Sequence, residues 1–297
     1  MSFFKKLFGG TSTSSTKISK RANQPDVFHV ANDEQRMNAA MDKARLTLQY
    51  FTRSLLNPAP EQQYFSLKAK IEDGSKVEHI WLTDVSVDDS GNFFGKIGNE
   101  PLNLTNVKLG QKVGIPSANV SDWMIVENGK LIGGYTIRAL RNQMTENERK
   151  AFDLSMGLYV DEGVDYYPHD FTTPEGAILC LEDAYDAQDL DLAIACKDFN
   201  EEAKLMLSKN EKMKSLSENK EMVDKMEEIL KLSFIKHMDG NFPSFKGVKR
   251  AFPETYYINE DMAIVTEVCF NTDKTKTTQR LYVSKASGEW KVLSLAD

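Results

Sequence analysis

The sequence has few cysteines and no long apolar run, and both shortages exclude classes of protein. Cys180, Cys196 and Cys269 are an odd number of cysteines, without a C-x-x-C spacing or an adjacent histidine. That pattern indicates neither a disulfide framework nor a zinc site. We therefore expect reduced thiols, a cytoplasmic protein, and no metal or other cofactor. No segment approaches the roughly 20 consecutive apolar residues that span a bilayer, so we expect no stable membrane insertion.

A surplus of positive charge is also missing. The 37 Lys and Arg residues are outnumbered by 44 Asp and Glu residues, which gives a net charge of −7 and a pI of about 5.3. Because contacts with nucleic-acid phosphates need clustered cations, we expect no nucleic-acid partner. The 297 residues are 41% hydrophobic and 27% charged, which is typical of a soluble globular protein of two domains.

Residues 1–30 are predicted to be a flexible basic leader. Lysines interrupt the apolar residues of the first eight positions, and no small-residue cleavage site follows, which argues against a secretory signal. Residues 11–25 are rich in Ser and Thr and then basic, as flexible segments often are. The early apolar side chains leave a peripheral membrane contact open, although a frayed tail is favoured.

Helix and strand signals define a first domain over residues 31–157. Apolar residues at steps of three and four predict a helix that Asn32 caps and that ends before Pro58. The pair Asn128-Gly129 predicts a tight hairpin, and a capping box at Thr145 predicts a further helix. Alternation of apolar and polar residues predicts antiparallel strands within residues 65–71, 77–85, 92–97, 123–126 and 130–132.

Residues 158–171 are predicted to be an irregular, acidic and aromatic connector, and residues 172–297 a second domain. Its helices are signalled, in order, by Thr173-Pro174, by Asp189 and by the apolar pattern of residues 219–238. After Gly247 the sequence reads as four strands. The predicted class is α+β in two domains, an N-terminal helix plus a small curved antiparallel sheet and a C-terminal helices-then-sheet domain.

The acidic charge is concentrated in one segment. From Ala151 to Cys196 there is no Lys or Arg, and eleven acidic residues are interleaved with tyrosines. Aromatic and acidic side chains together favour a surface that receives a basic partner, with a plain solvated face as the alternative. The residues expected to contact such a partner are Asp161, Glu162, Asp165, Tyr166, Tyr167, Asp170, Glu182, Asp183, Asp186 and Asp189.

No catalytic constellation is recognisable, so no catalytic residue is assigned. A Gly-rich phosphate loop, a nucleophile elbow, and H-x-x-x-H or EF-hand spacings are all missing. His79 and Asp122 could form an acid–base pair beside Arg138, which could hold a phosphate or carboxylate, but packing roles are favoured. The candidate pocket residues are His79, Trp81, Asp122, Trp123, Arg138, Tyr185 and His237.

Several segments of the first domain follow, in order, the pattern of one bacterial family. They are Phe65-Ser66-Leu67-Lys68, Glu78-His79-Ile80-Trp81, Gly91 with Phe94-Gly95, Asn99-Glu100-Pro101, Gly110-Gln111, Ser121-Asp122-Trp123-Met124, and Gly133-Gly134-Tyr135-Thr136 leading to Arg138. Over residues 33–157 the chain resembles the uncharacterised domains called YegJ-like. The family has no assigned reaction, but some members look like immunity proteins encoded beside polymorphic toxins.

Residues 172–297 resemble a second family, the nuclear-transport-factor-two-like cone, also called SnoaL-like. The resemblance rests on Thr173-Pro174-Glu175, on helices followed by four strands, and on Gly288-Glu289-Trp290-Lys291-Val292. That fold hosts enzymes, binding modules and immunity proteins, so it implies an architecture and not a reaction.

The patterns together favour a protein that is not an enzyme. We expect an immunity protein that binds a cognate antibacterial toxin, of the polymorphic, Rhs or type VI secretion kind, and occludes its active site. The partner is then a protein toxin with a basic cleft. Two alternatives stay open: an enzyme that reverses the toxin's modification or acts on a small molecule in the cone pocket, and a stress-related adaptor recruited to a membrane by its N-terminal segment.

Overall fold

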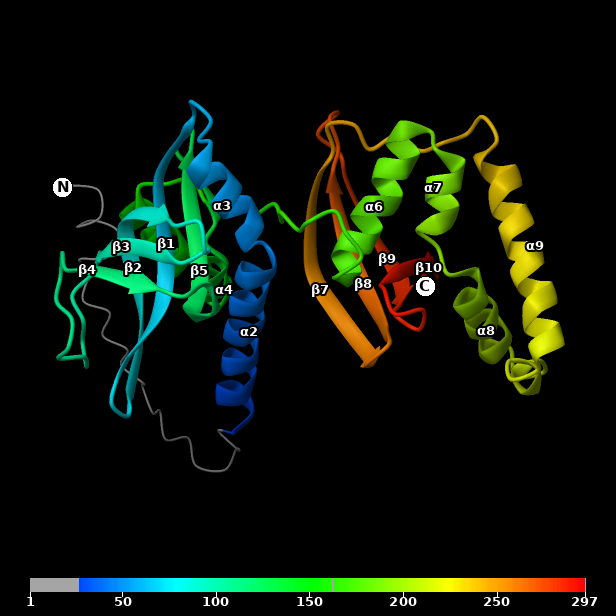
Figure 1. Cartoon of the computed structure of the whole chain (residues 1–297), viewed down its shortest axis with the longest axis horizontal. Helices are drawn as coiled ribbons and strands as arrows, with labels where there is room; N and C mark the ends of the chain where they lie inside the picture. The colour runs from blue at the N-terminus through cyan, green and yellow to red at the C-terminus, as the bar shows by residue number, and fades with distance from the viewer. Residues whose placement is uncertain (1–26, 162, 297) are drawn as a thin grey trace. The chain divides into compact units, whose positions relative to one another are not determined.

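The computed structural model describes residues 27–161 and 163–296, with side chains from residue 34 onward. The chain divides into two compact units between Tyr166 and Tyr167. Each unit contains helices and an antiparallel sheet (Figure 1). The α+β class predicted from the sequence is therefore confirmed. Residues 1–26 of the predicted leader lie outside the described residues, and residues 27–30 belong to a helix that begins at Val27.

The first unit is built on a six-stranded sheet. In chain order its elements are α2 (Val27–Leu46), α3 (Leu48–Leu56), β1 (Gln62–Asp73), β2 (Lys76–Val87), β3 (Phe93–Ile97), β4 (Lys112–Ile115), a 3-10 turn (Ser117–Asn119), β5 (Val120–Glu127), β6 (Lys130–Gly133), α4 (Tyr135–Asn142) and α5 (Glu146–Met156). The strand order is β4-β3-β2-β1-β5-β6, and each adjacent pair is antiparallel.

Helices cover both faces of this sheet. Since alternate residues of each strand point to opposite faces, neighbouring residues belong to different cores. Leu67, Ile80 and Trp123 belong to the core shared with α2 and α3. Their neighbours Trp81 and Met124 belong to a second core. The α4 and α5 residues of that second core are Ile137, Phe152 and Met156. Strands β2 and β5 thus contribute apolar side chains to both cores, whereas β1 contributes only to the first.

The first predicted helix differs from the observed one at its start and in its middle. It begins at Val27, so Asn32 lies inside the helix instead of capping it. It breaks at Thr47, between α2 and α3, where the hydroxyl of Thr47 donates to the carbonyl of Lys43 at 2.8 Å. The indole N–H of Trp123 donates to the hydroxyl of Thr47 at this point, a tertiary contact that the helical pattern cannot reveal.

The second unit has four helices followed by four strands. Its elements are α6 (Pro174–Ala187), α7 (Leu190–Ala195), α8 (Phe199–Lys209), a 3-10 turn (Lys214–Leu216), α9 (Lys220–Met238), β7 (Lys249–Asn259), β8 (Met262–Phe270), β9 (Lys276–Ser284) and β10 (Lys291–Leu295). The strand order is β10-β9-β8-β7. Ile178 and Leu181 of α6 pack on Val265 of β8 and Val283 of β9.

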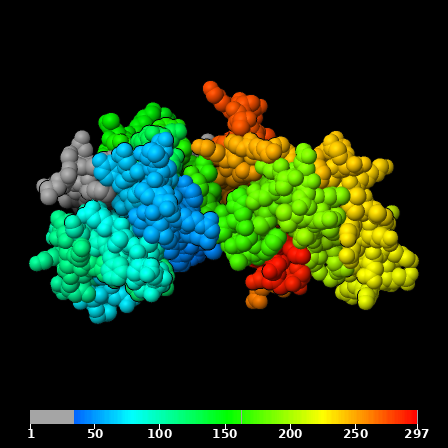
Figure 2. Space-filling view, turned by 45° about the horizontal axis from the view of Figure 1, so that its top comes forward, coloured from blue at the N-terminus to red at the C-terminus, as the bar shows by residue number. Residues whose placement is uncertain are grey.

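The capping signals at Thr145, Thr173 and Asp189 are confirmed, unlike the one at Asn32. Thr145 and Glu148 form a capping box at the start of α5, and Gly157 ends that helix with a φ of 63°. Thr173 caps α6 with Pro174 at its start, and Asp189 caps α7. Three elements were not predicted, namely α4, α8 and β4. α9 lies at the surface of its unit (Figure 2), and only Val223 and Met238 of this helix are buried.

Candidate functional site

Part of the acidic segment predicted to meet a partner is exposed in the second unit. The side chain of Asp183, on α6, is 55% exposed and its carboxylate lies 2.5 Å from Nδ1 of His169. Asp189 and Asp191, at the start of α7, are also exposed. Among the residues that the structure describes, no Lys or Arg forms an ion pair with these three carboxylates. We call Asp183, Asp189 and Asp191 the acidic α6–α7 surface.

Four residues of the predicted contact surface are packed inside the protein instead. The side chain of Asp165 is 7% exposed and forms an ion pair with Lys43 at 2.8 Å. Tyr166 stacks on Tyr50 with ring centroids 3.9 Å apart, and Tyr167 is 5% exposed. Glu182 is 2% exposed. The expectation that these residues meet a partner is corrected, because apolar or charged neighbours already cover them.

Three further residues of that prediction, Asp161, Asp170 and Asp186, bind groups of their own unit. Asp161 pairs with Arg138 at 3.2 Å. Asp170 accepts hydrogen bonds from the backbone N–H and hydroxyl of Thr172. Asp186 accepts from the backbone N–H of Phe245 at 2.6 Å. Glu162 lies outside the described residues.

A buried polar cluster lies between α6 and the sheet of the second unit. Nη2 of Arg250, on β7, is 2.6 Å from Oε2 of Glu182. Glu267, on β8, is fully buried and accepts a hydrogen bond from Nε2 of Gln279 at 2.6 Å. One ligand atom each of Glu182, Glu267 and Cys269 lies within 4.8 Å of the others. These three side chains have the geometry to hold a metal ion.

Burial dominates the electrostatics of this cluster. The pKa of Glu182 is raised to about 9, first by burial and then by the nearby charge of Glu267, while Arg250 opposes the rise. Burial, followed by the charges of Glu267 and Glu182, raises the pKa of the Cys269 thiol to about 12. In the absence of a metal ion, Glu182 is therefore protonated and Cys269 is a thiol at neutral pH.

Sequence reasoning assigned Glu182 to the surface and missed Glu267. A local signal for Glu267 does exist, because it shares a strand face with Ala263, Val265 and Cys269, all of which are buried. An acidic residue at an inward position of an alternating strand is unusual and indicates a specific partner. Nothing in the sequence near Glu267 identifies that partner as Glu182.

Asp122 is a structural residue of the first unit. Its Oδ1 accepts from the backbone N–H groups of Trp123 and Tyr135, at 2.8 and 3.1 Å. Its Oδ2 accepts from the backbone N–H and the hydroxyl of Thr136, at 2.8 and 2.6 Å. Burial raises the pKa of Asp122, whereas Thr136 and the charge of Lys68 lower it. This carboxyl group fixes the start of α4 to β5.

The predicted pair of His79 and Asp122 is not brought together. His79, on β2, is exposed opposite Lys70, while Asp122, on β5, is buried opposite Lys68, so that β1 lies between the two strands. Partial desolvation by its neighbours, followed by the charges of Lys68, Lys70 and Arg45, lowers the pKa of His79. An acid–base pair of these two residues is therefore excluded by their positions.

The donors of Arg138 are used by groups of the first unit itself, including the carboxylate of Asp161. Its Nε donates to the carbonyl of Gly133 at 2.9 Å, its Nη1 to the carbonyl of Asp161 at 2.6 Å, and its Nη2 to the carbonyl of Leu131 at 2.6 Å. Arg138 therefore joins β6 and α4 to the following segment. The suggested phosphate or carboxylate site at this residue is not formed.

The other candidate pocket residues are not gathered in one pocket. Trp81 and Trp123 lie in the two opposite cores of the first unit, 5% and 0% exposed. In the second unit, Tyr185 contacts the rings of Phe234, Phe242 and Phe245. His237 is exposed in the last turn of α9.

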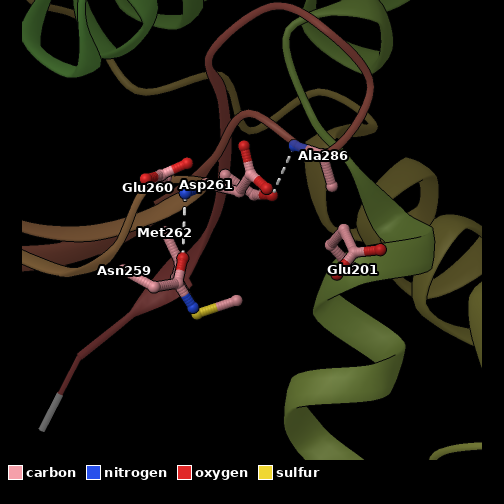
Figure 3. A pocket seen from close by; sticks show the side chains of 7 residues that line it. Glu201, Asn259, Glu260, Asp261, Met262 and Ala286 are labelled. Atoms are coloured by element: carbon pink, nitrogen blue, oxygen red, sulfur yellow. Dashed lines mark hydrogen bonds between the residues drawn. The ribbon is translucent and has the colours of Figure 1, made fainter.

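A surface hollow of about 430 Å³ lies beside the β7–β8 turn. Glu201 of α8 faces residues of this turn across the hollow (Figure 3). Lys204 already holds the carboxylate of Glu201 at 2.6 Å, so Glu260 and Asp261 supply the remaining acidic lining. No residue of this hollow was predicted as a site.

Comparisons with known proteins concern mainly the first unit. Residues 34–160 match the family model described as "Uncharacterized protein conserved in bacteria (DUF2314)". The chain is 40% identical over 108 residues to the uncharacterized protein YegJ of Escherichia coli (strain K12), covering 36% of this chain and 69% of that protein. No solved structure matches the chain significantly, and no described helix is long and apolar enough to cross a membrane.

A second relative matches a longer stretch. The chain is 32% identical over 192 residues to a putative ankyrin repeat protein of Neisseria meningitidis serogroup B (strain ATCC BAA-335 / MC58), covering 62% of this chain and 71% of that protein. This aligned stretch is longer than the family match over residues 34–160, so it includes residues outside that range. The chain belongs to the bacterial family of uncharacterized proteins that includes YegJ, and its first unit carries the family's domain.

Proposed function

We propose that this protein binds and neutralises a cognate antibacterial toxin by placing acidic residues of its second unit against a basic cleft of that toxin. The same proposal takes the second unit to be a cone domain, which its order of helices followed by four antiparallel strands supports. In this function the protein acts by occlusion and is not an enzyme.

The acidic α6–α7 surface is the observation that carries the proposal. Asp183, Asp189 and Asp191 are exposed in a segment without any Lys or Arg. Within the described part of the chain, the one ion pair of these carboxylates joins Asp183 to His169. Exposed charges of one sign attract a partner of the opposite sign and raise its association rate.

The comparisons support a binding role only in general terms. One relative is named as a putative ankyrin repeat protein, and stacked repeats of that type present extended binding surfaces. The first unit also resembles domains found in immunity proteins, and this resemblance suggests that the partner is a protein toxin. A basic partner protein is therefore a more economical proposal than a small molecule or a nucleic acid.

The experiment measures binding to the product of the adjacent toxin-like gene. The test variant combines Asp183→Asn, Asp189→Asn and Asp191→Asn. Asparagine at position 189 still caps α7, so the variant removes charge and keeps the helix start. We expect the association rate at low salt to fall roughly tenfold or more, and protection of cells against the toxin to decrease.

A control variant changes the net charge by the same amount elsewhere in the second unit. It combines Glu218→Gln, Asp224→Asn and Glu228→Gln, three exposed residues at or near α9. This control should bind with nearly the unchanged rate. The proposal fails if the unmodified protein does not bind and inhibit the gene product, or if both variants lose the same affinity.

The enzymatic alternative has one observation in its favour. The second unit buries two carboxyl groups and a guanidinium group, of Glu182, Glu267 and Arg250, and such clusters occur at catalytic sites. Under this alternative, Glu267→Gln loses protection while its affinity for the toxin stays unchanged. Under occlusion alone, protection follows affinity in every variant.

A further inference from the structure

We propose that Glu182, Glu267 and Cys269 form a binding site for a divalent cation of the zinc class inside the second unit. The proposal is independent of toxin binding. It concerns residues that no sequence motif joins, because Glu182 lies on α6 whereas Glu267 and Cys269 lie on β8.

The positions of the ligand atoms are the first support. One ligand atom from each residue lies within 4.8 Å of the other two, so small side-chain movements would bring all three to the roughly 2.0–2.3 Å at which zinc is bound. Glu267 and Cys269 are two residues apart on a strand and therefore point to the same face. Helix α6 packs on that face through Ile178 and Leu181, which brings Glu182 to it.

Unpartnered buried oxygens are the second, independent support. Oε1 of Glu182 and Oε1 of Glu267 are buried and have no hydrogen-bond partner. Glu182 is 2% exposed and Glu267 0% exposed, so bulk water does not reach them. A buried polar atom without a partner destabilises the fold by about 1–3 kcal/mol, and a bound cation would provide the missing partner.

Neighbouring residues orient the two carboxylates. Nε2 of Gln279 donates to Oε2 of Glu267 at 2.6 Å, which leaves Oε1 of Glu267 free for a metal ion. Arg250 contacts Oε2 of Glu182 at 2.6 Å. Outer partners of this kind hold metal ligands in position in known sites.

The charges also balance. Two carboxylates and one thiolate carry three negative charges, and Arg250 together with a divalent cation carries three positive charges. Without the cation, the same buried site is neutral only when protons occupy the ligands. Metal binding therefore exchanges protons for the cation.

The donor set selects the class of metal. A thiolate is a soft ligand that favours zinc and similar ions, whereas magnesium and calcium prefer oxygen ligands alone. Three protein ligands leave one tetrahedral position for water, as in many zinc sites that are not fully closed. Cobalt(II) takes the same geometry and makes a useful spectroscopic probe.

The test uses the full chain, first stripped of metal by a chelator. Because the cluster is buried, the protein is unfolded and refolded with zinc or with cobalt(II), and excess metal is removed. We expect one equivalent of zinc by elemental analysis and a thiolate-to-cobalt absorption band. Cys269→Ser should abolish the band, and Glu267→Gln should weaken binding by about 10- to 100-fold.

Two matched variants control for general effects of substitution. Cys196→Ser changes a different buried thiol of the same unit, and Glu175→Gln changes a different buried carboxyl group of α6. Both should keep the band and the bound equivalent.

A stability measurement on the unmodified protein keeps the test decisive if variants fold poorly. A metal that binds the folded state raises the melting temperature in a concentration-dependent way. The proposal is overturned if the refolded protein holds no stoichiometric zinc or cobalt and zinc leaves its melting temperature unchanged. The cluster would then be a carboxyl pair that shares a proton. It is also overturned if Cys196→Ser loses the band and Cys269→Ser keeps it.

Discussion

The indole Nε1 of Trp123 donates a hydrogen bond to Oγ1 of Thr47, with 3.1 Å between the two atoms. The same N–H lies 3.1 Å from the carbonyl of Ala44. The helix that begins at Val27 breaks at this point, and α3 continues from Leu48. A strand residue thus contacts the break in a helix that is distant in sequence, through two hydrogen bonds from one N–H group.

Thr47→Val tests this relationship. Valine keeps the shape of the side chain and removes the oxygen that accepts from Trp123, so we expect unfolding to become easier by about 1 kcal/mol. Thr52→Val is the control, because the hydroxyl of Thr52 donates to Leu48 within its own helix. Urea unfolding measures both. An equal decrease of the unfolding free energy in the two variants would contradict a specific role for the Trp123 contact.

Asp122→Asn should lower the unfolding free energy far more than Thr47→Val does. The carboxyl group accepts four hydrogen bonds in a fully buried place, two at each oxygen, and the amide nitrogen of asparagine cannot accept the two at its position. We expect a loss of about 3 kcal/mol or more in unfolding free energy. Asp88→Asn is the comparison, because Asp88 caps an exposed turn through Ser90 and Asn92. If the two substitutions lower the unfolding free energy equally, the hydrogen bonds of Asp122 do not hold α4 against β5.

Gly133→Ala and Gly129→Ala separate crowding from backbone strain. Both glycines have positive φ, 69° and 74°, but a Cβ at position 133 would lie 2.6 Å from the ring of Trp123, whereas at position 129 it would meet nothing within 4 Å. Strain alone costs about 1–2 kcal/mol, and crowding adds about 1–3 kcal/mol at position 133. Thermal unfolding should rank the variants in that order, and the reverse order would be inconsistent with the packing of Trp123.

His79→Gln should reduce the loss of stability in acid. The pKa of His79 is lowered in the folded protein, so the unfolded chain binds the proton more readily. The stability contributed by the neutral side chain is therefore present above the unfolded value of about 6.5 and is lost as the pH falls below it. Unfolding free energies at about pH 7.5 and about pH 5 measure the effect.

The comparison variant for His79 is His237→Gln, which removes an exposed histidine of the second unit. An unchanged acid sensitivity in His79→Gln would show that Lys68, Lys70 and Arg45 do not repel a proton at this position.

Local interactions made a large part of the fold predictable. The capping box of Thr145 and Glu148, the caps Thr173 and Asp189, and the Asn128-Gly129 turn involve atoms only a few residues apart. Strand alternation is equally local. The sequence could not predict β4, which has only four residues, or α4, whose start depends on the carboxyl group of Asp122.

The sequence predicted the candidate site correctly only for acidic residues whose side chains are exposed. Composition identified the acidic segment, and Asp183 and Asp189 are exposed as expected. Composition could not separate them from Asp165 and Glu182, which are packed against Lys43 and Arg250. The difference depends on which distant segment lies opposite each carboxylate.

The sequence by itself determined the class of fold, the starts of α5, α6, α7 and α9 and the uneven distribution of charge, because periodicity, caps and composition act over short stretches of chain. Only the tertiary structure decided the break at Thr47, the burial of Asp122 and the meeting of Glu182 with Glu267 and Cys269. Each of these depends on a helix packing against a strand that is remote in sequence, and packing of that kind is set by the shape of the whole core.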